Sequence, residues 1–433
     1  MKTFFISLVL LATIPLSVLA GEKDKDNQLI MNLQLRPRAE YRNGSINPRM
    51  GSDDAAAFIN NHSRLSLGYT TDGMSMGFSI QNAGVWGQDP QVSRNPNLGI
   101  HEAWAQLNSQ NGFFVKIGRQ TLVYDDERLL GALDWNTAGR SHDVLKTGFE
   151  TKSHKLHLAL AYNQNAEHIN GDSYYNSTGQ PYKTMQTLWY QYNGFSQVFK
   201  PSFLFMNLGL ENGNPITRVS ELAYMQTFGT YISSSNSNGF GINLSAYLQT
   251  GTTRSNETIS AWMISAKGSF AINKKFTFAV GSDWLSGEET TNNNTSYNAF
   301  NPLYGTHHKF YGAMDYFYAS SFAGNLNPGL WDNYLGISYK PAKNLSVSAT
   351  YHYFAITADI ADSNNSLYNK GLGSEIDLQL DWVLRKDVRL ACGYSSFFGT
   401  GTMDRMKGGD HTSWQDWGWI SINFNPELLK LKF

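Results

Sequence analysis

Apolar and polar residues alternate strictly through many short segments of this chain. Within residues 239–249, Phe240, Ile242 and Leu244 alternate with glycine, asparagine and serine. The segment 373–385 follows the same rule, with charged residues in its polar set. A period of two places the two sets on opposite faces of a β-strand. One face of each strand is therefore suited to an apolar phase, and the other is suited to water.

The lengths of the connections between these segments indicate how the strands are arranged. We predict eighteen strands, at residues 29–42, 59–71, 73–82, 100–108, 112–119, 143–151, 154–164, 185–193, 200–210, 218–229, 239–249, 258–271, 275–285, 331–340, 344–355, 373–385, 387–398 and 413–425. Longer and shorter connections alternate, nine against eight, so both chain ends lie on the short-turn side. Tight periplasmic turns, long external loops and an even strand number are typical of outer-membrane barrels. We predict an all-β fold, a transmembrane antiparallel up-and-down β-barrel of about 18 strands.

The composition agrees with a barrel and excludes a helical membrane protein. Mean hydropathy is -0.37, and no internal run approaches the roughly 18 apolar residues of a membrane-spanning helix. Aromatic residues make up 14% of the chain and charged residues 16%, as expected for a barrel with aromatic girdles. The alternative is a soluble β-sandwich, propeller or β-helix, but no repeat of fixed period is visible. The single cysteine, Cys392, excludes an intramolecular disulfide.

The first residues resemble a targeting segment rather than part of the fold. Residues 1–20 contain Lys2, an apolar core at 4–11 and a small-residue cleavage pattern at 18–20. We predict a Sec-type signal peptide, a short periplasmic segment at 21–28 and an outer-membrane barrel at 29–433. The predicted location is the bacterial cell outer membrane.

In a barrel the apolar residues of each strand face the lipid, because charge in hydrocarbon is costly. The alternate, polar residues therefore face the lumen. The predicted lumen groups are Arg36, Arg38, Glu40, Arg42, Arg64, Lys116, Arg119 and Lys146, with acidic Glu375, Asp377 and Asp381 on the segment 373–385. Barrel closure is expected to bring that segment within one strand of Arg36 and Arg38. Two interpretations stay open: the charges pair across the lumen and hold its shape, or the basic groups form a track for an anionic solute. Pro37 lacks a ladder donor, so we expect a bulge or break there.

The long connection 120–142 contains charges of alternating sign. Asp126, Arg128, Asp134, Arg140 and Asp143 suggest a network that needs enclosure to be satisfied. We therefore predict that this loop folds into the lumen. A further segment, 308–318, would make a nineteenth strand, and we place it in the long loop after 275–285, folded inward.

Several motifs resemble the alginate-export family of outer-membrane porins. They are His101-Glu102-Ala103-Trp104, Gly118-Arg119-Gln120, Arg128-Leu129-Leu130-Gly131, Asp134-Trp135, Gly139-Arg140 with Asp143, Arg36-Pro37-Arg38-Ala39-Glu40, Asn301-Pro302-Leu303-Tyr304 with His308, Tyr311-Gly312-Ala313-Met314-Asp315 and Gly373-Ser374-Glu375-Ile376-Asp377. The resemblance implies an eighteen-stranded monomeric barrel whose arginine-rich pore passes an anionic uronate polymer outward. It implies basic roles for Arg36, Arg38, Arg119, Arg128 and Arg140, and acidic partner roles for Glu102, Asp134 and Asp143.

Other chemistry is poorly supported. Ser141, His142 and Asp143 are adjacent, so alternating directions prevent a catalytic relay. His307 and His308 have no third ligand nearby in the sequence. We predict no enzyme activity, no metal, no cofactor and no nucleic-acid partner.

The sequence therefore predicts a passive channel in the outer membrane. We expect it to contact outer-membrane lipid and to pass an anionic oligo- or polysaccharide, or a small anion, past lumen arginines. Periplasmic export components are possible further partners. The alternatives are a general small-solute porin with structural lumen charges, and a surface adhesion or structural barrel.

Overall fold

The computed structural model is one continuous β-wall with loops inside it. The structure describes residues 27–44, 46–92, 97–164, 166–167, 169, 182–194, 198–214, 219–236, 239–290, 296–318, 322 and 326–433. The predicted signal peptide, residues 1–20, lies outside the described residues. The described part contains no helix long and apolar enough to cross a membrane.

The wall consists of strands of about 6 to 17 residues, in the lengths that a spanning barrel needs. The elements are β1 (Gln28–Leu35), β2 (Arg38–Asn43), β3 (Ala56–Thr71), β4 (Met74–Val85), β5 (Gly99–Asn108), β6 (Phe113–Gln120), β7 (His142–Glu150), β8 (His154–Tyr162), β9 (Thr184–Tyr192), β10 (Phe199–Asn214), β11 (Val219–Ser235), β12 (Phe240–Thr252), β13 (Thr258–Ala271), β14 (Phe276–Leu285), the two-residue β15 (Ser296–Tyr297), η3 (His307–Lys309), β16 (Leu330–Ala342), β17 (Leu345–Ala355), β18 (Gly371–Arg385), β19 (Val388–Gly399), α2 (Gly401–Lys407), β20 (Gln415–Phe424) and β21 (Glu427–Lys432).

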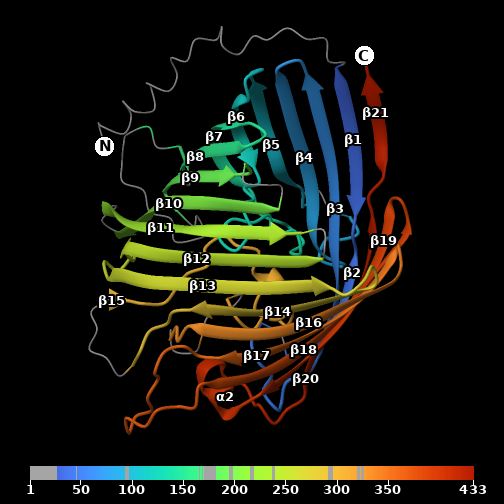
Figure 1. Cartoon of the computed structure of the whole chain (residues 1–433). Coiled ribbons are helices and arrows are strands. Elements are labelled where there is room, and N and C mark those ends of the chain that lie inside the picture. The colour runs from blue at the N-terminus through green and yellow to red at the C-terminus, as the bar shows by residue number, and fades with distance from the viewer. Residues whose placement is uncertain are drawn as a thin grey trace.

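The sheet closes on itself, and neighbouring strands are antiparallel except for the short β15 (Figure 1). Closure occurs at the chain ends, where β1 pairs with both β3 and β21, and β2 pairs with both β3 and β20. Because β1 and β2 together make one crossing, as do β20 and β21, and the two-residue β15 makes none, the 21 strands form an eighteen-stranded barrel. The predicted fold class and strand number are confirmed.

Proline interrupts the wall where the sequence predicts it. β1 ends at Leu35 and β2 begins at Arg38, so Arg36 and Pro37 lie between them. This confirms the expected break at Pro37, whose nitrogen cannot donate to a ladder. A second break, which we did not predict, separates β20 from β21 at Pro426.

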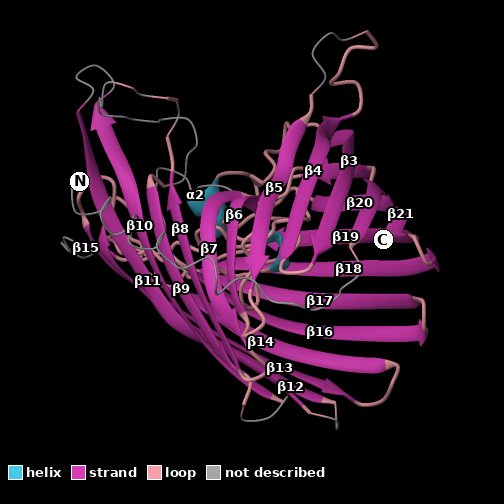
Figure 2. Cartoon of the chain, turned by 90° about the horizontal axis from the view of Figure 1, so that it is seen from above, coloured by secondary structure: helices cyan, strands magenta, loops and turns pink. Residues whose placement is uncertain are grey.

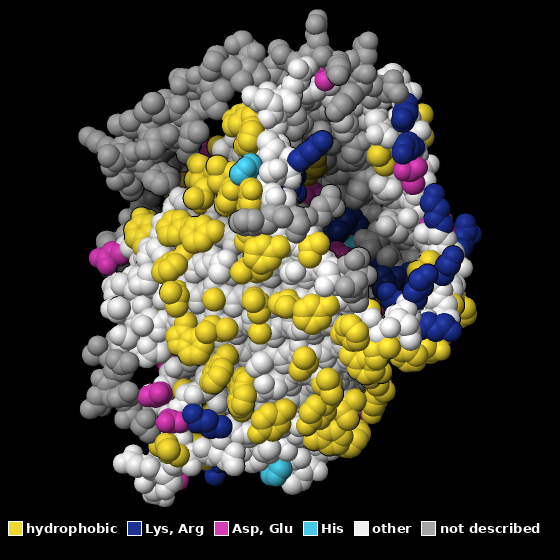
Figure 3. All heavy atoms as spheres, viewed as in Figure 1, with side chains coloured by type: hydrophobic (Ala, Val, Ile, Leu, Met, Phe, Trp, Pro, Cys, Tyr) yellow, Lys and Arg dark blue, Asp and Glu magenta, His cyan; other side chains and the backbone are white. Residues whose placement is uncertain are grey.

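The two faces of each strand differ in exposure. On β16, Leu335 and Ile337 point outward and are exposed, whereas Asp332 points inward and is buried. Similar apolar side chains spread over the outer surface (Figure 3). An exposed apolar band of this kind is suited to lipid.

Two long connections occupy the space that the strands surround (Figure 2). They are residues 121–141 and 286–329, described in the second case at 286–290, 296–318, 322 and 326–329. They meet backbone to backbone, because Gly131 N donates to the Tyr304 carbonyl and Tyr304 N to the Leu129 carbonyl, both at 3.0 Å. The segment 308–318 forms no strand, and its Tyr311 and Tyr316 are buried in the interior cluster.

Gly118 on β6 is a position where a side chain cannot be accommodated. Its φ is +118°, and an added Cβ would collide with the Ala103 carbonyl oxygen on β5. We expect Gly118→Ala to cost on the order of 1–3 kcal/mol, through strain in a conformation that suits only glycine. Gly268→Ala on β13 is the matched control, because nothing lies within 4 Å of its Cβ position and its φ is ordinary. Guanidinium unfolding in detergent compares the two, and equal midpoints would contradict this account.

Candidate functional site

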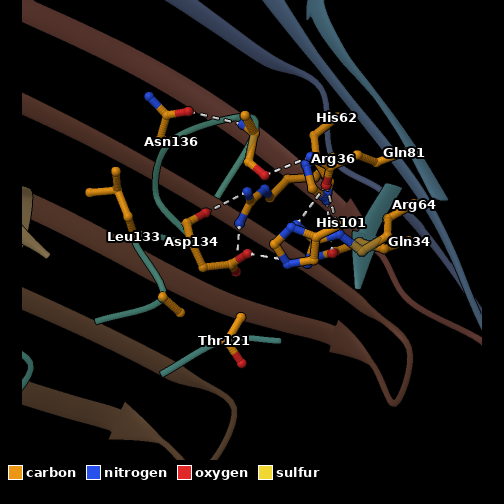
Figure 4. Close-up of polar contacts among 12 residues, drawn as sticks. Gln34, Arg36, His62, Arg64, Gln81, His101, Thr121, Leu133, Asp134 and Asn136 are labelled. Atoms are coloured by element: carbon orange, nitrogen blue, oxygen red, sulfur yellow. Dashed lines mark hydrogen bonds and ion pairs between the residues drawn. The ribbon is translucent and has the colours of Figure 1, made fainter. Parts of the chain in front are cut away.

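Arg36 and Arg64 approach the same carboxylate of the inner loop (Figure 4). Arg36 lies at the break between β1 and β2, and its Nη1 is 3.2 Å from Asp134 Oδ2 while its Nη2 donates to the Asp134 carbonyl at 2.6 Å. Arg64 on β3 places Nη1 3.6 Å from Asp134 Oδ1. The Asp134 side chain is 52% exposed, so this carboxylate is open to solvent. The group carries two positive charges and one negative charge.

Wall side chains hold the backbone of the same loop. His62 Nδ1 lies 2.5 Å from the Thr137 carbonyl, and Gln81 Nε2 donates to the Ala138 carbonyl at 2.6 Å. Arg38 Nη1 donates to the Trp135 carbonyl at 2.9 Å, and its guanidinium lies 4.0 Å from the centre of the Trp135 ring. Each of these three loop carbonyls is thus in hydrogen-bond contact with a polar side chain of β2, β3 or β4 instead of with water. These contacts fix the position of Asp134.

Arg38, Glu40 and Arg42 form a compact charged triad on β2. Arg38 Nε lies 2.7 Å from Glu40 Oε1, and Arg42 Nε lies 2.8 Å from Glu40 Oε2. Trp417 Nε1 donates to Glu40 Oε2 at 3.0 Å, and Asn60 also donates to this carboxylate. Glu40 therefore stabilises two adjacent arginines, and the triad keeps one net positive charge.

Arg128 holds the inner loop to the opposite wall. Its Nη1 and Nη2 bind the two Asp283 oxygens of β14 at 2.7 and 3.0 Å, and its Nε lies 2.8 Å from Asp126 Oδ2. The residue is only 4% exposed. Burial by itself lowers the pKa of Arg128, but Asp283, Tyr311 and Asp126 together outweigh it and raise that pKa above its ordinary value. Arg128 therefore holds the loop 121–141 against β14 and does not line an open passage through the lumen.

Three more predicted basic groups lie inside the barrel. Arg140 Nη1 donates to the Tyr304 and Gly305 carbonyls, which joins the two inner loops, and burial lowers its pKa. Lys116 and Lys146 are directly opposite each other on β6 and β7. Lys116 Nζ lies 3.5 Å from the centre of the Trp104 ring. Neither lysine forms a salt bridge with a described carboxylate.

A family comparison decides what kind of barrel this is. The family model described as "Alginate export" matches residues 27–412. This chain belongs to the alginate-export family. The resemblance seen in the sequence is thereby confirmed, and so is an outer-membrane barrel of a channel-forming family.

Solved structures agree with the fold of this alginate-export protein. OccAB4 of Acinetobacter baumannii is 12% identical, with a TM-score of 0.60, over 94% of this chain and 99% of that one. OccD3 (OpdP) of Pseudomonas aeruginosa is 12% identical, with a TM-score of 0.61, over 93% and 92%. OpdK of the same organism, solved with vanillate, is 11% identical, with a TM-score of 0.59, over 94% and 99%. Among curated proteins no relative matches the chain.

Two predicted lumen residues of this family member face the other way. Register places Phe78, Ala103, Arg119 and Asp143 in one row across β4 to β7, and Phe78 is exposed on the outer surface. Arg119 and Asp143 accordingly form an exposed pair, with Nη1 2.9 Å from Oδ2. The lumen placement of Arg119 and the acidic role of Asp143 there are therefore wrong, since a residue three positions from inward-facing Lys116 must face outward.

The predicted acidic partners on β18 also have different partners from those expected. Glu375 accepts from Met314 N at 2.8 Å and Asp377 from Ala313 N at 3.3 Å, so both hold the inner segment 308–318. Two strands, β19 and β20, separate β18 from β2, which is one more than predicted. Pairing of this stripe with Arg36 and Arg38 is therefore wrong. Glu102 accepts from Thr121 N at 3.2 Å, at the start of the inner loop.

The alternation of apolar and polar residues also indicates an acidic partner of Arg128 that we did not identify from the sequence. Asp283 lies in the inward set of β14, because Phe278, Val280 and Trp284 are exposed outward. Alternation along 275–285 could thus have predicted an inward carboxylate opposite the inner loop.

Among the described residues, one group has the spacing of a metal site. The candidate ligand atoms of Asp404, Asp410 and His411 lie within 4.8 Å of one another, in the loop between β19 and β20. However, Asp410 already accepts hydrogen bonds from Thr412 and Ser413, and His411 Nδ1 contacts Asp404 Oδ2 at 2.5 Å. These contacts occupy most of the candidate ligand atoms, although Asp404 Oδ1 is buried without a hydrogen-bond partner among the described residues.

Proposed function

We propose that this protein is an outer-membrane channel that passes anionic oligo- or polysaccharides of the alginate type, or smaller anions, past arginines in its lumen. The observation that carries the proposal is the group formed by Arg36, Arg64 and Asp134. Two guanidinium groups meet one solvent-exposed carboxylate, so the surplus charge is positive. A uronate carboxylate matches the paired donors of a guanidinium. OpdK, a fold relative, has been solved with vanillate, and vanillate is a carboxylate, which agrees with this class of ligand.

In the proposed mechanism, solute carboxylates exchange with Asp134 on Arg36 and Arg64 during passage. Binding must be strong enough for solute to enter and weak enough for it to leave. A fixed carboxylate at the arginines lowers the net attraction and so favours release. No covalent step is required.

The proposal is tested by ion selectivity. We expect Arg36→Gln with Arg64→Gln to lower the permeability ratio of anions to cations by roughly a factor of five for each charge removed, because a charge about 4 Å away is worth about 1 kcal/mol even in water. The measurement is the reversal potential in a planar bilayer under a salt gradient. Arg119→Gln is the control outside the lumen, because Arg119 faces outward; it removes one positive charge, and its effect is compared with that of each single lumen variant, Arg36→Gln and Arg64→Gln.

Other results would favour the alternatives. A conducting channel whose selectivity is the same in both variants would indicate a general small-solute porin, a function that the carboxylate or carbonyl partners of Arg38, Arg128 and Arg140 also suit. A barrel without conductance would indicate a surface protein whose inner loops close the lumen.

A further inference from the structure

Basic residues ring the inner wall at the end of the barrel that carries the short turns. In barrels of this class that end is periplasmic. We define the vestibule ring as the inward-facing basic residues there: Lys155 on β8, Lys200 on β10, Lys267 on β13, Lys340 on β16, Arg389 on β19, and Lys430 and Lys432 on β21.

Strand alternation gives these side chains their direction. On β16, Lys340 belongs to the same set as buried Asp332, whereas Ile337 and Tyr339 are exposed on the outer surface. On β21, Lys430 and Lys432 alternate with outward Leu431. These basic groups therefore point into the lumen and away from lipid.

Exposure shows that the lumen is open at this level. Lys267, Lys340, Arg389, Lys430 and Lys432 are all exposed although they face inward. Farther along the lumen, towards the long loops, the inward carboxylates are covered, as with Glu375 and Asp332, which are 0% exposed. An inward side chain can reach water only where the space in front of it is empty of protein. The ring therefore surrounds a water-filled vestibule.

The charge of this vestibule is strongly positive. Arg389 has a carboxylate partner, since its Nη2 lies 2.5 Å from Asp381 Oδ1. The turns beside the ring add Lys274, Lys275, Lys343, Arg385 and Lys386, and dark blue side chains accordingly gather along the right-hand edge of Figure 3. Acidic residues at the same end include Asp72, Glu150 and Asp387, and Asp387 pairs with Arg385 at 2.7 Å. Exposed acidic residues also occupy the long-loop end, where they include Asp53, Asp54, Asp89, Glu167, Glu221 and Glu257. The two mouths thus differ in electrostatic potential.

We propose that the vestibule ring collects an anionic saccharide chain at the periplasmic mouth and feeds it towards Arg36 and Arg64. This inference rests on the proposed function and adds the mouth at which the chain is captured. Clefts of one charge sign with low-dielectric walls raise the association rate of an opposite charge by 10- to 1000-fold. A polymer gains more than a small anion, because several of its carboxylates meet the ring at once.

The test is the side dependence of channel block. A hexamer of mannuronate is added to one chamber of a planar bilayer in 0.1 M salt, and the rate constant for the onset of current block is measured from each side. Channel orientation is read with streptavidin on a biotinylated Asp54→Cys background, because that position lies at the long-loop end. We expect block to begin about tenfold faster from the turn side, within the range for electrostatic steering.

The decisive variant is Lys340→Gln with Lys430→Gln and Lys432→Gln. We expect its rate of block from the turn side to fall to that from the loop side, while the lifetime of each block stays unchanged. The control removes the same charge from the loop end by Arg254→Gln, Lys370→Gln and Arg405→Gln, and is expected to keep the asymmetry.

Failure of this inference and failure of the proposed function give different results. An anion-selective channel that is blocked equally from both sides, or from neither, would overturn the ring as a collection surface and leave the proposed function intact. Loss of asymmetry in the control to the same degree as in the ring variant would also overturn it. A channel that lacks anion selectivity altogether would overturn the proposed function itself.

Discussion

Arg128→Met is expected to raise single-channel conductance severalfold. Arg128 is the only cation bound to Asp283 among the described salt bridges, and both its terminal nitrogens take part in that contact. Removing it leaves a carboxylate that is 1% exposed without a counter-charge, at a cost of about 3–5 kcal/mol. The inner loop 121–141 can avoid that cost by moving away and admitting water to Asp283. Planar-bilayer conductance measures the opening directly.

A double variant distinguishes the effect of the unpaired Asp283 carboxylate from the effect of losing the Arg128 side chain. Arg128→Met with Asp283→Leu removes both charges, and replacing a buried ion pair by apolar groups is often neutral. Asp126, the other partner of Arg128, keeps some contact with water because its side chain is 16% exposed. We therefore expect conductance to return close to that of the natural protein. A single variant with unchanged conductance would show that other contacts hold the loop.

Alternation was sufficient to predict the wall because it depends on each strand alone. Each segment with one apolar face became a strand, and Pro37 produced its break for a local reason, the missing donor. The same local rule applied to Arg38, Glu40 and Arg42, which share one face of β2 and contact one another. Where the rule was not applied strictly, as at Arg119, the prediction failed.

The paths of the inner loops could not be read from periodicity. Met314 and Ala313 donate to Glu375 and Asp377, residues about sixty positions later in the chain. Nothing local to β18 indicates that backbone amides, rather than arginines, donate to its carboxylates. The family resemblance implied an acidic role for Asp134, but its contact with both Arg36 and Arg64 depends on how the loop 121–141 returns across the lumen. Such contacts depend on the tertiary arrangement.

Glu40→Gln is expected to cost about 3–5 kcal/mol of stability, because it leaves the guanidinium groups of buried Arg38 and half-buried Arg42 without their counter-charge. Glu40 is 4% exposed and accepts from Arg38, Arg42, Trp417 and Asn60. The neutral amide also offers one acceptor oxygen where the carboxylate offers two, so at least one donor loses its partner. Guanidinium unfolding in detergent gives the free energy.

Asp381→Asn is the matched control for Glu40→Gln. It removes one carboxylate charge from a pair whose arginine, Arg389, is 54% exposed and can be solvated by water, so we expect a loss of less than about 1 kcal/mol. Equal losses in the two variants would mean that Glu40 contributes no more than an exposed pair. A larger loss for Glu40 would identify the triad as the element that holds β2 in the wall beside Pro37, and hence holds Arg36 at the position from which it contacts Asp134.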